Sequence, residues 1–434
     1  YLTRAANTSN TTKATYSFWV KKSGLAADQI IHNFYSASDT YNKLYFDGNN
    51  QIILKQQIGG STQIQIMPNM KFTDVSGWYN IVYSIDTTQS TEADRVKVYI
   101  NGVQTTSLGT ATFPSANANV AIGYTQYIGR EYTGDTKFFN GSLSHFNFVD
   151  GTAYAASTFG STDSTTGEWK INTSPSVTYG TNGFLILKDG NTITDQSGNS
   201  NNFTLGGGTL TNTEDNPSNV FATVNAMAPA TGNLTSLKYG NLELKQQNNP
   251  YAWPVTLCGH TGKWYWEQKV SALGTTAVGI LKQDKFPQKD SVFYPFAQAT
   301  GYAYKNTGNK GNNNNDSSYG NSYTSGDILS VAFDQTNGTI WFGKNGTWQN
   351  NATDAQIAAG TTTYAAFSSM PTNGEFYGPF IYADGSTEVA SNFGNGYFGI
   401  TAVASAGTNA SANGIFEYDV PAGFTALSTK GLNL

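Results

Sequence analysis

Residues 78–103 read WYNIVYSIDTTQSTEADRVKVYINGV, and residues 326–348 repeat the same local pattern as GDILSVAFDQTNGTIWFGKNGTW. Each copy has an alternating segment that ends in an aspartate (Asp86, Asp334), then a polar loop, a second alternating segment and an Asn-Gly pair. Alternation with a period of two is typical of a half-buried β-strand. Asn-Gly between two such segments predicts a hairpin, because a type I′ turn needs positive φ at both central residues. Two copies so far apart predict two antiparallel β-sandwiches in tandem.

The composition of the 434-residue chain is typical of a large all-β protein. Charged residues make up 12% of it, about half the usual share, while aromatic residues reach 14% and there are 46 glycines. Aromatic and β-branched residues favour strands, and glycine favours the turns between them. A chain of this length has room for two or three domains.

Charge and hydropathy argue against two classes of partner. The net charge is −5 and no basic run is longer than Lys21-Lys22, so the sequence lacks the electrostatic footprint of a nucleic-acid-binding protein. No apolar stretch approaches the length of a membrane span, and we expect no membrane insertion. The single cysteine, Cys258, excludes an intrachain disulfide and a thiolate metal cluster.

Alternating segments and turn signals continue along both halves of the chain, as in TYSFWVKK at residues 15–22. We expect a first sandwich over residues 1–210, a linker over 211–234, and a second sandwich with a C-terminal tail over 235–434. The polar, low-complexity stretch GNKGNNNNDSSYGNSY, residues 308–323, is predicted to form an exposed loop.

Several stretches carry a resemblance to known families. Residues 1 to about 150 resemble a laminin-G/concanavalin A-like jelly roll, in YLTRA, YSFWVKKS, WYNIVYSIDTTQSTEADRVKVYINGVQ and GSLSHFNFVDGTAYAASTFGSTDSTTGEWK. Residues from about 235 to 420 resemble a SPRY domain, in TGKWYWEQKV, AVGI, YAY, SGDILSVAFDQTNGTIWFGKNGTWQN and NFG. The implied fold class is all-β, with two tandem antiparallel concanavalin A-like β-sandwiches (jelly rolls) joined by an irregular bridge.

The order of these parts, with the bridge and the closing stretch ANGIFEYDVPAGFTALSTKGLNL, resembles structural proteins of tailed bacteriophages, many of them marine. The resemblance implies a non-enzymatic protein of the virion surface, and so extracellular, such as a fibre, spike or capsid decoration. Its expected partners are other virion structural proteins and host-surface glycan, and a homo-oligomer such as a trimer is an open alternative. A purely architectural decoration or shaft module is the main rival interpretation.

A polysaccharide-degrading enzyme is the third interpretation, because folds of this kind also include glycoside hydrolases. Such enzymes need two carboxylates flanking the cleft, which on one strand means an acid–x–acid–x–acid pattern. No such pattern occurs; Glu92 and Asp94 come closest, and they lie in a predicted loop. His32, His145 and His260 have no metal-ligand spacing. We therefore expect no catalytic residues.

Glycan binding would need aromatic side chains as platforms, together with fixed polar groups. The tyrosines of GYTQYIGREY are candidates in the first half, and other candidates lie in predicted turns and loops. For each aromatic residue, packing in the core is the alternative. The candidate ligand-binding residues are Trp78, Tyr124, Tyr127, Tyr132, Trp348 and Tyr377.

Calcium is the one metal for which the sequence offers ligands. TDQSGNSNN places Asp195, Ser197 and Asn199 at positions i, i+2 and i+4, which can bring side-chain oxygens together. No glutamate closes a twelve-residue loop as an EF-hand requires. The alternative is an Asx-turn stabilised by Asp195 and the following glycine.

Overall fold

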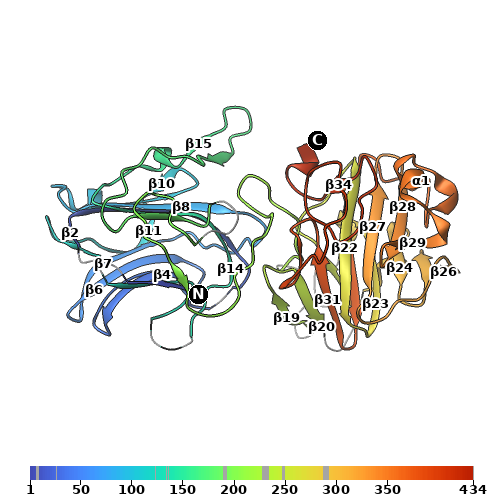
Figure 1. Ribbon diagram of the computed structural model, residues 1–434, viewed down its shortest axis with the longest axis horizontal. Coiled ribbons are helices and arrows are strands. Elements are labelled where there is room, and N and C mark those ends of the chain that lie inside the picture. The colour runs from blue at the N-terminus through green and yellow to red at the C-terminus, as the bar shows by residue number, and fades with distance from the viewer. Residues whose placement is uncertain are drawn as a thin grey trace. The chain divides into compact units, whose positions relative to one another are not determined.

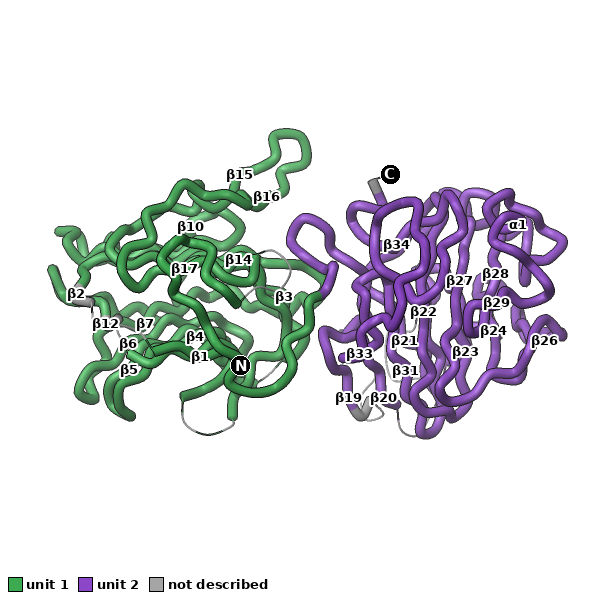
Figure 2. The backbone as a smooth tube through the Cα atoms, viewed as in Figure 1, with its two compact units in different colours: residues 1–212 green, residues 213–434 purple. Residues whose placement is uncertain are grey.

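The computed structural model describes residues 1–5, 9–25, 27–122, 124–132, 134, 136–188, 193–226, 234–246, 250–286 and 293–433. The chain forms two compact units, Tyr1–Asn212 and Thr213–Leu434 (Figure 2). Both consist of antiparallel sheets, and the described residues contain one α-helix, α1 (Asp354–Ala358) (Figure 1). The predicted fold class, two tandem all-β sandwiches, is confirmed.

Unit 1 is a sandwich of two sheets, as far as its described residues show. The first has the strand order β11 (Leu108–Thr112), β7 (Ser61–Pro68), β6 (Ile52–Ile58), β5 (Thr40–Phe46), β4 (Gln29–Ala37), β13 (Thr125–Ile128), β1 (Leu2–Arg4) and β18 (Thr204–Leu205). The second has the order β10 (Val103–Thr105), β9 (Val96–Ile100), β8 (Tyr79–Asp86), β3 (Lys13–Lys22), β14 (Gly141–Asp150) and β17 (Phe184–Ile186). Two small pairs join β2 (Ser9–Thr11) to β12 (Val120–Ile122) and β15 (Gly160–Thr162) to β16 (Trp169–Ile171).

Unit 2 repeats this plan with different strand numbers. One sheet has the order β19 (Leu234–Lys238), β20 (Glu243–Gln246), β31 (Thr387–Asn392), β22 (Lys263–Ala272), β27 (Ile328–Asp334), β28 (Thr339–Lys344) and β29 (Thr347–Trp348), and β34 (Thr425–Ala426) runs parallel to β22. The other has the order β21 (Tyr251–Pro254), β30 (Tyr377–Asp384), β23 (Thr275–Lys282), β24 (Gly301–Lys305), β25 (Asn309–Asn312) and β26 (Asn315–Ser318). A short pair joins β32 (Tyr397–Phe398) to β33 (Thr401–Ala402).

The two Asn-Gly pairs form the turns that the sequence predicts. Asn101 and Gly102 have φ values of 47° and 79°, and Asn345 and Gly346 have 48° and 76°. The turn asparagine also ties down the start of the first strand of each copy. Asn101 Oδ1 accepts a hydrogen bond from the Asn80 amide at 2.8 Å, and Asn345 Oδ1 accepts one from the Ile328 amide at 2.8 Å. The repeat in the sequence is therefore a repeat in the structure.

The aspartate that ends the first strand of each copy has the same partner in both units. Asp86 pairs in register with Lys13, and their charged groups are 3.1 Å apart. Asp334 pairs in register with Lys263 at 3.4 Å. In both units this lysine begins the strand next to the hairpin, so the similarity extends beyond the two quoted stretches.

Each unit has its own apolar core between its two sheets, built from the inward residues of alternating strands. Burial of these side chains is the main driving force for folding. The largest include Tyr16, Phe18, Phe34 and Tyr83 in unit 1, and Trp266, Tyr304, Phe342 and Tyr377 in unit 2.

The Asn-rich stretch differs from its prediction. Residues 309–318 form the hairpin of β25 and β26 rather than a loop, with the turn at Asn313 and Asn314, whose φ values are 51° and 60°. Asparagine tolerates the left-handed region better than other non-glycine residues, so a polar tract can make this turn without glycine.

The segment expected as a linker, 211–234, contains a part that belongs to unit 2. Phe221 and Val224 are buried, and they form isolated bridges to Ser428 and Val255. Residues 227–233 lie outside the described part of the chain. Among the described residues, no helix has the length and apolar character that a membrane span requires.

Candidate functional site

Three of the six predicted ligand-binding residues lie in the protein interior. Trp78 and Trp348 are each 8% exposed, and Tyr377 is 2% exposed. The Trp348 indole Nε1 donates to Asp354 Oδ1 at 2.8 Å, and Tyr377 packs in the core between the sheets of unit 2. These contacts leave the three rings almost no surface for a ligand.

The other three, Tyr124, Tyr127 and Tyr132, lie in unit 1. Tyr124 packs against the core. Tyr127 belongs to β13, and its ring lies 5.1 Å from the guanidinium of Arg130. Tyr132 stacks on Tyr35, with ring centroids 3.7 Å apart and an interplanar angle of 14°. The structure thus separates Tyr124 from the other two.

Strand register places Tyr127 on the outer face of the sheet that contains β13. Side chains paired across neighbouring strands share a face. A first row crosses six strands, and we call it the lysine row: Tyr127, Asn33, Lys43, Lys55, Gln65 and Thr112. A second, parallel row is the tyrosine row: Thr125, Tyr35, Tyr41 and Gln57. The alternate residues Leu44, Leu54 and Ile66 point into the core, so both rows face outward.

The tyrosine–lysine face, defined as these two rows with Tyr132, has aromatic and cationic groups in contact. The Lys43 ammonium lies 4.4 Å from the ring centroid of Tyr41 and 4.8 Å from that of Tyr132. The Tyr41 hydroxyl donates to Gln57 Oε1 at 2.7 Å. These contacts fix the rings, and fixed rings lose little conformational freedom when a ligand binds.

A carboxylate under this face holds two lysines in place. Glu131 is 4% exposed and pairs with the ammonium groups of Lys43 and Lys137, the latter at 2.8 Å. Burial alone would raise the pKa of Glu131, but hydrogen bonds from Lys137 and Lys43 outweigh it and hold the pKa below its usual value. Glu131 is therefore ionised at neutral pH and acts as a structural anchor.

Asn33 lies in the lysine row beside this anchor. Its Nδ2 donates to the backbone carbonyl of Arg130 at 2.7 Å, and the side chain is fully buried. Its Oδ1 accepts no hydrogen bond from any described residue. A buried carbonyl oxygen without a donor is costly, but because Asn33 is fully buried this oxygen lies out of reach of a ligand on the surface.

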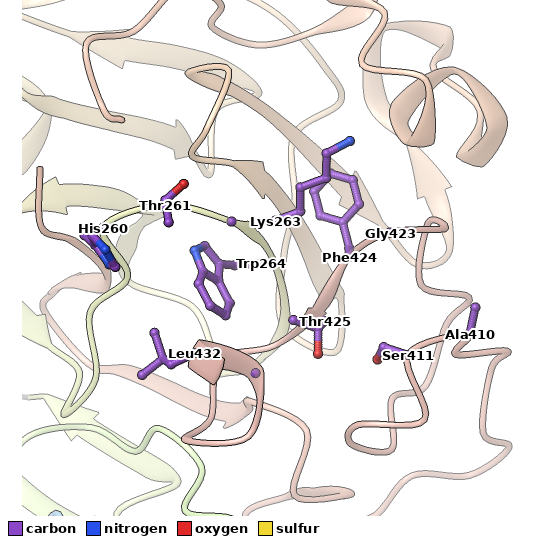
Figure 3. Close-up of a pocket in the computed structure, with 12 residues that line it drawn as sticks. His260, Thr261, Lys263, Trp264, Ala410, Ser411, Gly423, Phe424, Thr425 and Leu432 are labelled. Carbon is purple, nitrogen blue, oxygen red and sulfur yellow. The ribbon is translucent and has the colours of Figure 1, made fainter. Parts of the chain in front are cut away.

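Unit 2 contains a second candidate, a cavity of about 400 Å³ next to the start of β22 (Figure 3). The Trp264 indole lies between His260 on one side and Thr425 on the other. Polar groups that line the cavity are largely hydrogen-bonded to other parts of the chain. Trp264 Nε1 donates to Gln335 Oε1 at 3.1 Å, and Thr425 Oγ1 accepts from Asn413 Nδ2 at 2.9 Å. The cavity therefore offers mainly shape and apolar surface.

Residues 404–427, which we call the C-terminal strap, cover the outer face of the β22 sheet up to Phe424 and end in β34, a strand of that sheet. Phe416 is 1% exposed and packs edge-to-face on Tyr265, with centroids 4.8 Å apart. Glu267 holds the strap: its carboxylate accepts hydrogen bonds from the amides of Glu417 at 2.8 Å and Tyr418 at 2.9 Å.

Glu267 is fully buried, and it also accepts from the Tyr265 hydroxyl at 3.0 Å and from Asn392 Nδ2 at 3.3 Å. Burial raises the pKa of Glu267 to about 7, although these four donors oppose the rise. Perturbed carboxyls often mark active sites. Here all four donors come from the chain itself, and two of them are backbone amides of the strap. The contacts therefore indicate that Glu267 fixes the strap to the sheet.

The three residues predicted for calcium lie in one turn. Asp195 Oδ1 accepts from the amides of Leu185 and Ser197, both at 2.9 Å, and Oδ2 accepts from the Ser197 hydroxyl at 2.7 Å and the Asn201 amide at 2.9 Å. Asn199 Nδ2 donates to the carbonyl oxygens of Gly180 and Gly183. The carboxylate thus has four donors from the chain, which favours the Asx-turn, and calcium binding stays a prediction. Within the described residues, no group of three or more His, Cys, Asp or Glu side chains could hold a metal ion.

Two family profiles match the chain. Residues 1–157 match the concanavalin A-like lectin/glucanases superfamily, and residues 263–396 match the SPRY domain. The chain thus contains one domain of each kind, as the sequence resemblance implies. No curated protein sequence matches it.

Several solved structures are similar to parts of the chain. The SPRY domain of human HERC1 is 18% identical, with a TM-score of 0.28, and the match covers 35% of this chain and 87% of that one. Another human SPRY domain is 19% identical, with a TM-score of 0.26 and coverages of 35% and 90%. A heptameric pentraxin from Limulus polyphemus is 16% identical, with a TM-score of 0.26 and coverages of 35% and 77%.

Sequence reasoning missed most of the tyrosine–lysine face. Tyr35, Tyr41 and Lys43 were not candidates, although the alternation in TYNKLYF puts Tyr41 and Lys43 on one side and Leu44 on the other. This alternation could have been read from the sequence. The pairing of β13 with β4 could not, because about ninety residues separate the two strands along the chain.

Proposed function

We propose that this protein is a non-enzymatic binding protein of a virion surface that contacts host-surface carbohydrate through the tyrosine–lysine face of unit 1. The observation that supports this most is the stack of Tyr35 on Tyr132, flanked by Tyr41 and by amide side chains on the same face. Carbohydrate sites combine aromatic surface with a few fixed polar groups, and this face offers both. The match to a lectin-containing superfamily over the same unit agrees with the proposal.

The electrostatics of the face support binding rather than hydrolysis. A glycosidase needs a carboxylic acid whose pKa is raised so that it can donate a proton to the leaving group. Glu131 has the opposite property, because its two lysine partners hold its pKa low. We therefore propose that bound sugar is held and released unchanged.

A glycan array probed with the full chain tests the carbohydrate part. We expect binding to one glycan class, and loss of about tenfold in affinity for Tyr132→Ala, since a stacking ring contributes on the order of 1.4 kcal/mol. Tyr239→Ala is the matched control, because Tyr239 is a 40% exposed tyrosine of unit 2. Absence of binding to any glycan, including those of the native host, would count against the proposal.

The virion part of the proposal is supported by the order of sequence motifs, which resembles tailed-bacteriophage structural proteins. We propose other virion structural proteins as partners, and a homo-oligomer such as a trimer as the assembled form. Electron microscopy of the intact particle tests the location. Density at a tail tip would support adhesion, whereas density confined to the capsid lattice without glycan binding would support the purely architectural alternative.

A further inference from the structure

The lysine row places two like charges directly opposite each other. Lys43 of β5 and Lys55 of β6 are register partners on the outer face. The Cβ atoms of such a pair lie about 5 Å apart, and like charges at paired positions are destabilising. Glu131 neutralises Lys43, but no hydrogen bond or ion pair within the described residues engages the ammonium of Lys55. Among the described residues, Lys55 is therefore a cation of this face without a partner.

The surroundings of the row are cationic in a chain whose net charge is −5. Four cations lie on or beside it: Lys43, Lys55, Arg130 and Lys137. Among the described residues, two carboxylates face them, Glu131 and Asp28, and both pair with Lys137, at 2.8 and 3.8 Å. Lys55 thus adds positive charge where the aromatic rings are also gathered.

The row is also long. It crosses six strands from β13 to β11, and at a spacing of about 4.8 Å between strands it spans about 24 Å. Beyond Lys55 it continues with Gln65 and Thr112, which are half-buried and exposed polar residues. A surface of this length fits several consecutive sugar units that lie across the strands.

From these observations we infer that the tyrosine–lysine face takes an anionic polysaccharide, with an acidic group directed at Lys55 and the sugar rings along Tyr35 and Tyr132, which are half-buried. This inference rests on the proposed carbohydrate function and adds the charge of the ligand. Carboxylate and sulfate groups share the chemistry that would recognise a lysine, so the test must separate them.

Titration calorimetry of the full chain with three polymers makes this test: a polyuronate (alginate), a sulfated galactan (carrageenan) and a neutral glucan (dextran). We expect binding of one polyanion, weaker binding at higher salt, and no binding of dextran. The polyanion that binds identifies the acidic group.

Lys55→Gln is the informative variant because it removes the charge and keeps most of the side-chain length. We expect it to weaken polyanion binding about fivefold, the size of one partly exposed ion pair, while Lys55→Arg retains binding. Lys97→Gln is the matched control, since Lys97 lies on β9 of the opposite sheet and pairs with Asp94 at 3.1 Å. It should bind like the unaltered protein.

Three results would overturn the inference. Equal weakening by Lys97→Gln would mean general attraction of a polyelectrolyte. Tight binding of dextran without any effect of Lys55→Gln would leave the carbohydrate function standing and remove its charge preference. Failure of all three polymers, together with a glycan array that shows no binding, would remove both.

Discussion

The two units have the same plan, but the sheet without the Asn-Gly hairpin has a polar outer surface in unit 1 and an apolar one in unit 2. In unit 1 this outer surface holds lysines, amides, the half-buried Tyr35 and the buried Tyr41. In unit 2 the corresponding face of the β30 sheet is apolar: Phe380 and Tyr382 lie against Phe286, Phe293 and Phe296. A shared fold therefore does not locate a function. The difference in surface is what led us to propose unit 1 as the polar binding unit.

The hairpin-bearing sheets are alike in being covered. In unit 1, Trp169 lies over Gly102, and in unit 2, Tyr418 of the strap lies over Gly346. Figure 1 shows β15 on the side of β8 and β10 that faces away from β4, β6 and β7. Each unit thus uses a segment that follows its repeat to close the sheet carrying the hairpin.

The largest expected effect tests how much the covering segment of each unit contributes to the free energy of unfolding of that unit. Phe416→Ala should destabilise unit 2 by about 3–5 kcal/mol, because a fully buried aromatic ring of the strap is lost. Trp169→Ala should cost unit 1 less, since Trp169 is half-buried, although its Nε1 donates to Asn80 Oδ1 at 3.0 Å. Chemical denaturation with a probe in each unit measures both. Equal costs would show that the covers are equivalent.

Next in size is the response of the hairpin turns. Gly102→Ala and Gly346→Ala should each destabilise their own unit by about 1–3 kcal/mol, because both residues have positive φ. The added Cβ would also lie 2.3 Å from Trp169 in the first case and 2.7 Å from Tyr418 in the second. Gly48→Ala is the control, since nothing lies within 4 Å of its added Cβ. Thermal unfolding that leaves both hairpin variants unchanged would contradict the shared turn geometry.

The units should also respond to pH in opposite directions. The raised pKa of Glu267, about 7 against 4.5, gives unit 2 stability that is present below pH 4.5 and lost as pH rises through 7. The lowered pKa of Glu131 gives unit 1 stability that is present above 4.5 and lost on acidification. Urea midpoints measured from about pH 2 to pH 8 should show both slopes, that of unit 1 below pH 4.5 and that of unit 2 between about 4.5 and 7, each of at most about 1.4 kcal/mol per pH unit.

Glutamine variants assign each slope to its residue. Glu267→Gln should flatten the pH dependence of unit 2 alone, and Glu131→Gln that of unit 1 alone. A slope that survives its own substitution would have another origin.

The smallest expected effect concerns the turn at Asp195. Because four donors from the chain already occupy its carboxylate, we expect a chelator to leave the Tm of unit 1 unchanged. A fall in Tm on chelation, reversed by calcium, would show that the turn holds an ion and that Asp195 is a ligand.

Local signals in the sequence were enough for much of the fold. The Asn-Gly turns and the alternating strands depend on neighbours within a few residues, so Asn101 and Asn345 could be assigned correctly. The hairpin at Asn313 was missed because asparagine there does the work that glycine usually does in such turns. Composition alone cannot distinguish that tract from a loop.

The candidate site was less accessible from the sequence because it depends on contacts between distant segments. Tyr132 acquires its role from Tyr35, which lies almost a hundred residues earlier. Trp348 and Tyr377 show the converse: an aromatic residue near a predicted loop was expected on the surface, and packing placed it inside. Alternation tells which residues share a face, but strand order decides which faces come together.

The C-terminal strap limits where this chain can be truncated. The SPRY match ends at residue 396, whereas the side chains that shield Tyr265 and Trp341 from water come from residues beyond it, Phe416 and Phe424 among them. A chain cut at the family boundary would expose a broad aromatic sheet surface and leave the buried Glu267 without two of its donors. Aggregation of such a fragment would then reflect the place of the cut, and the smallest autonomous form of unit 2 is longer than its family signature.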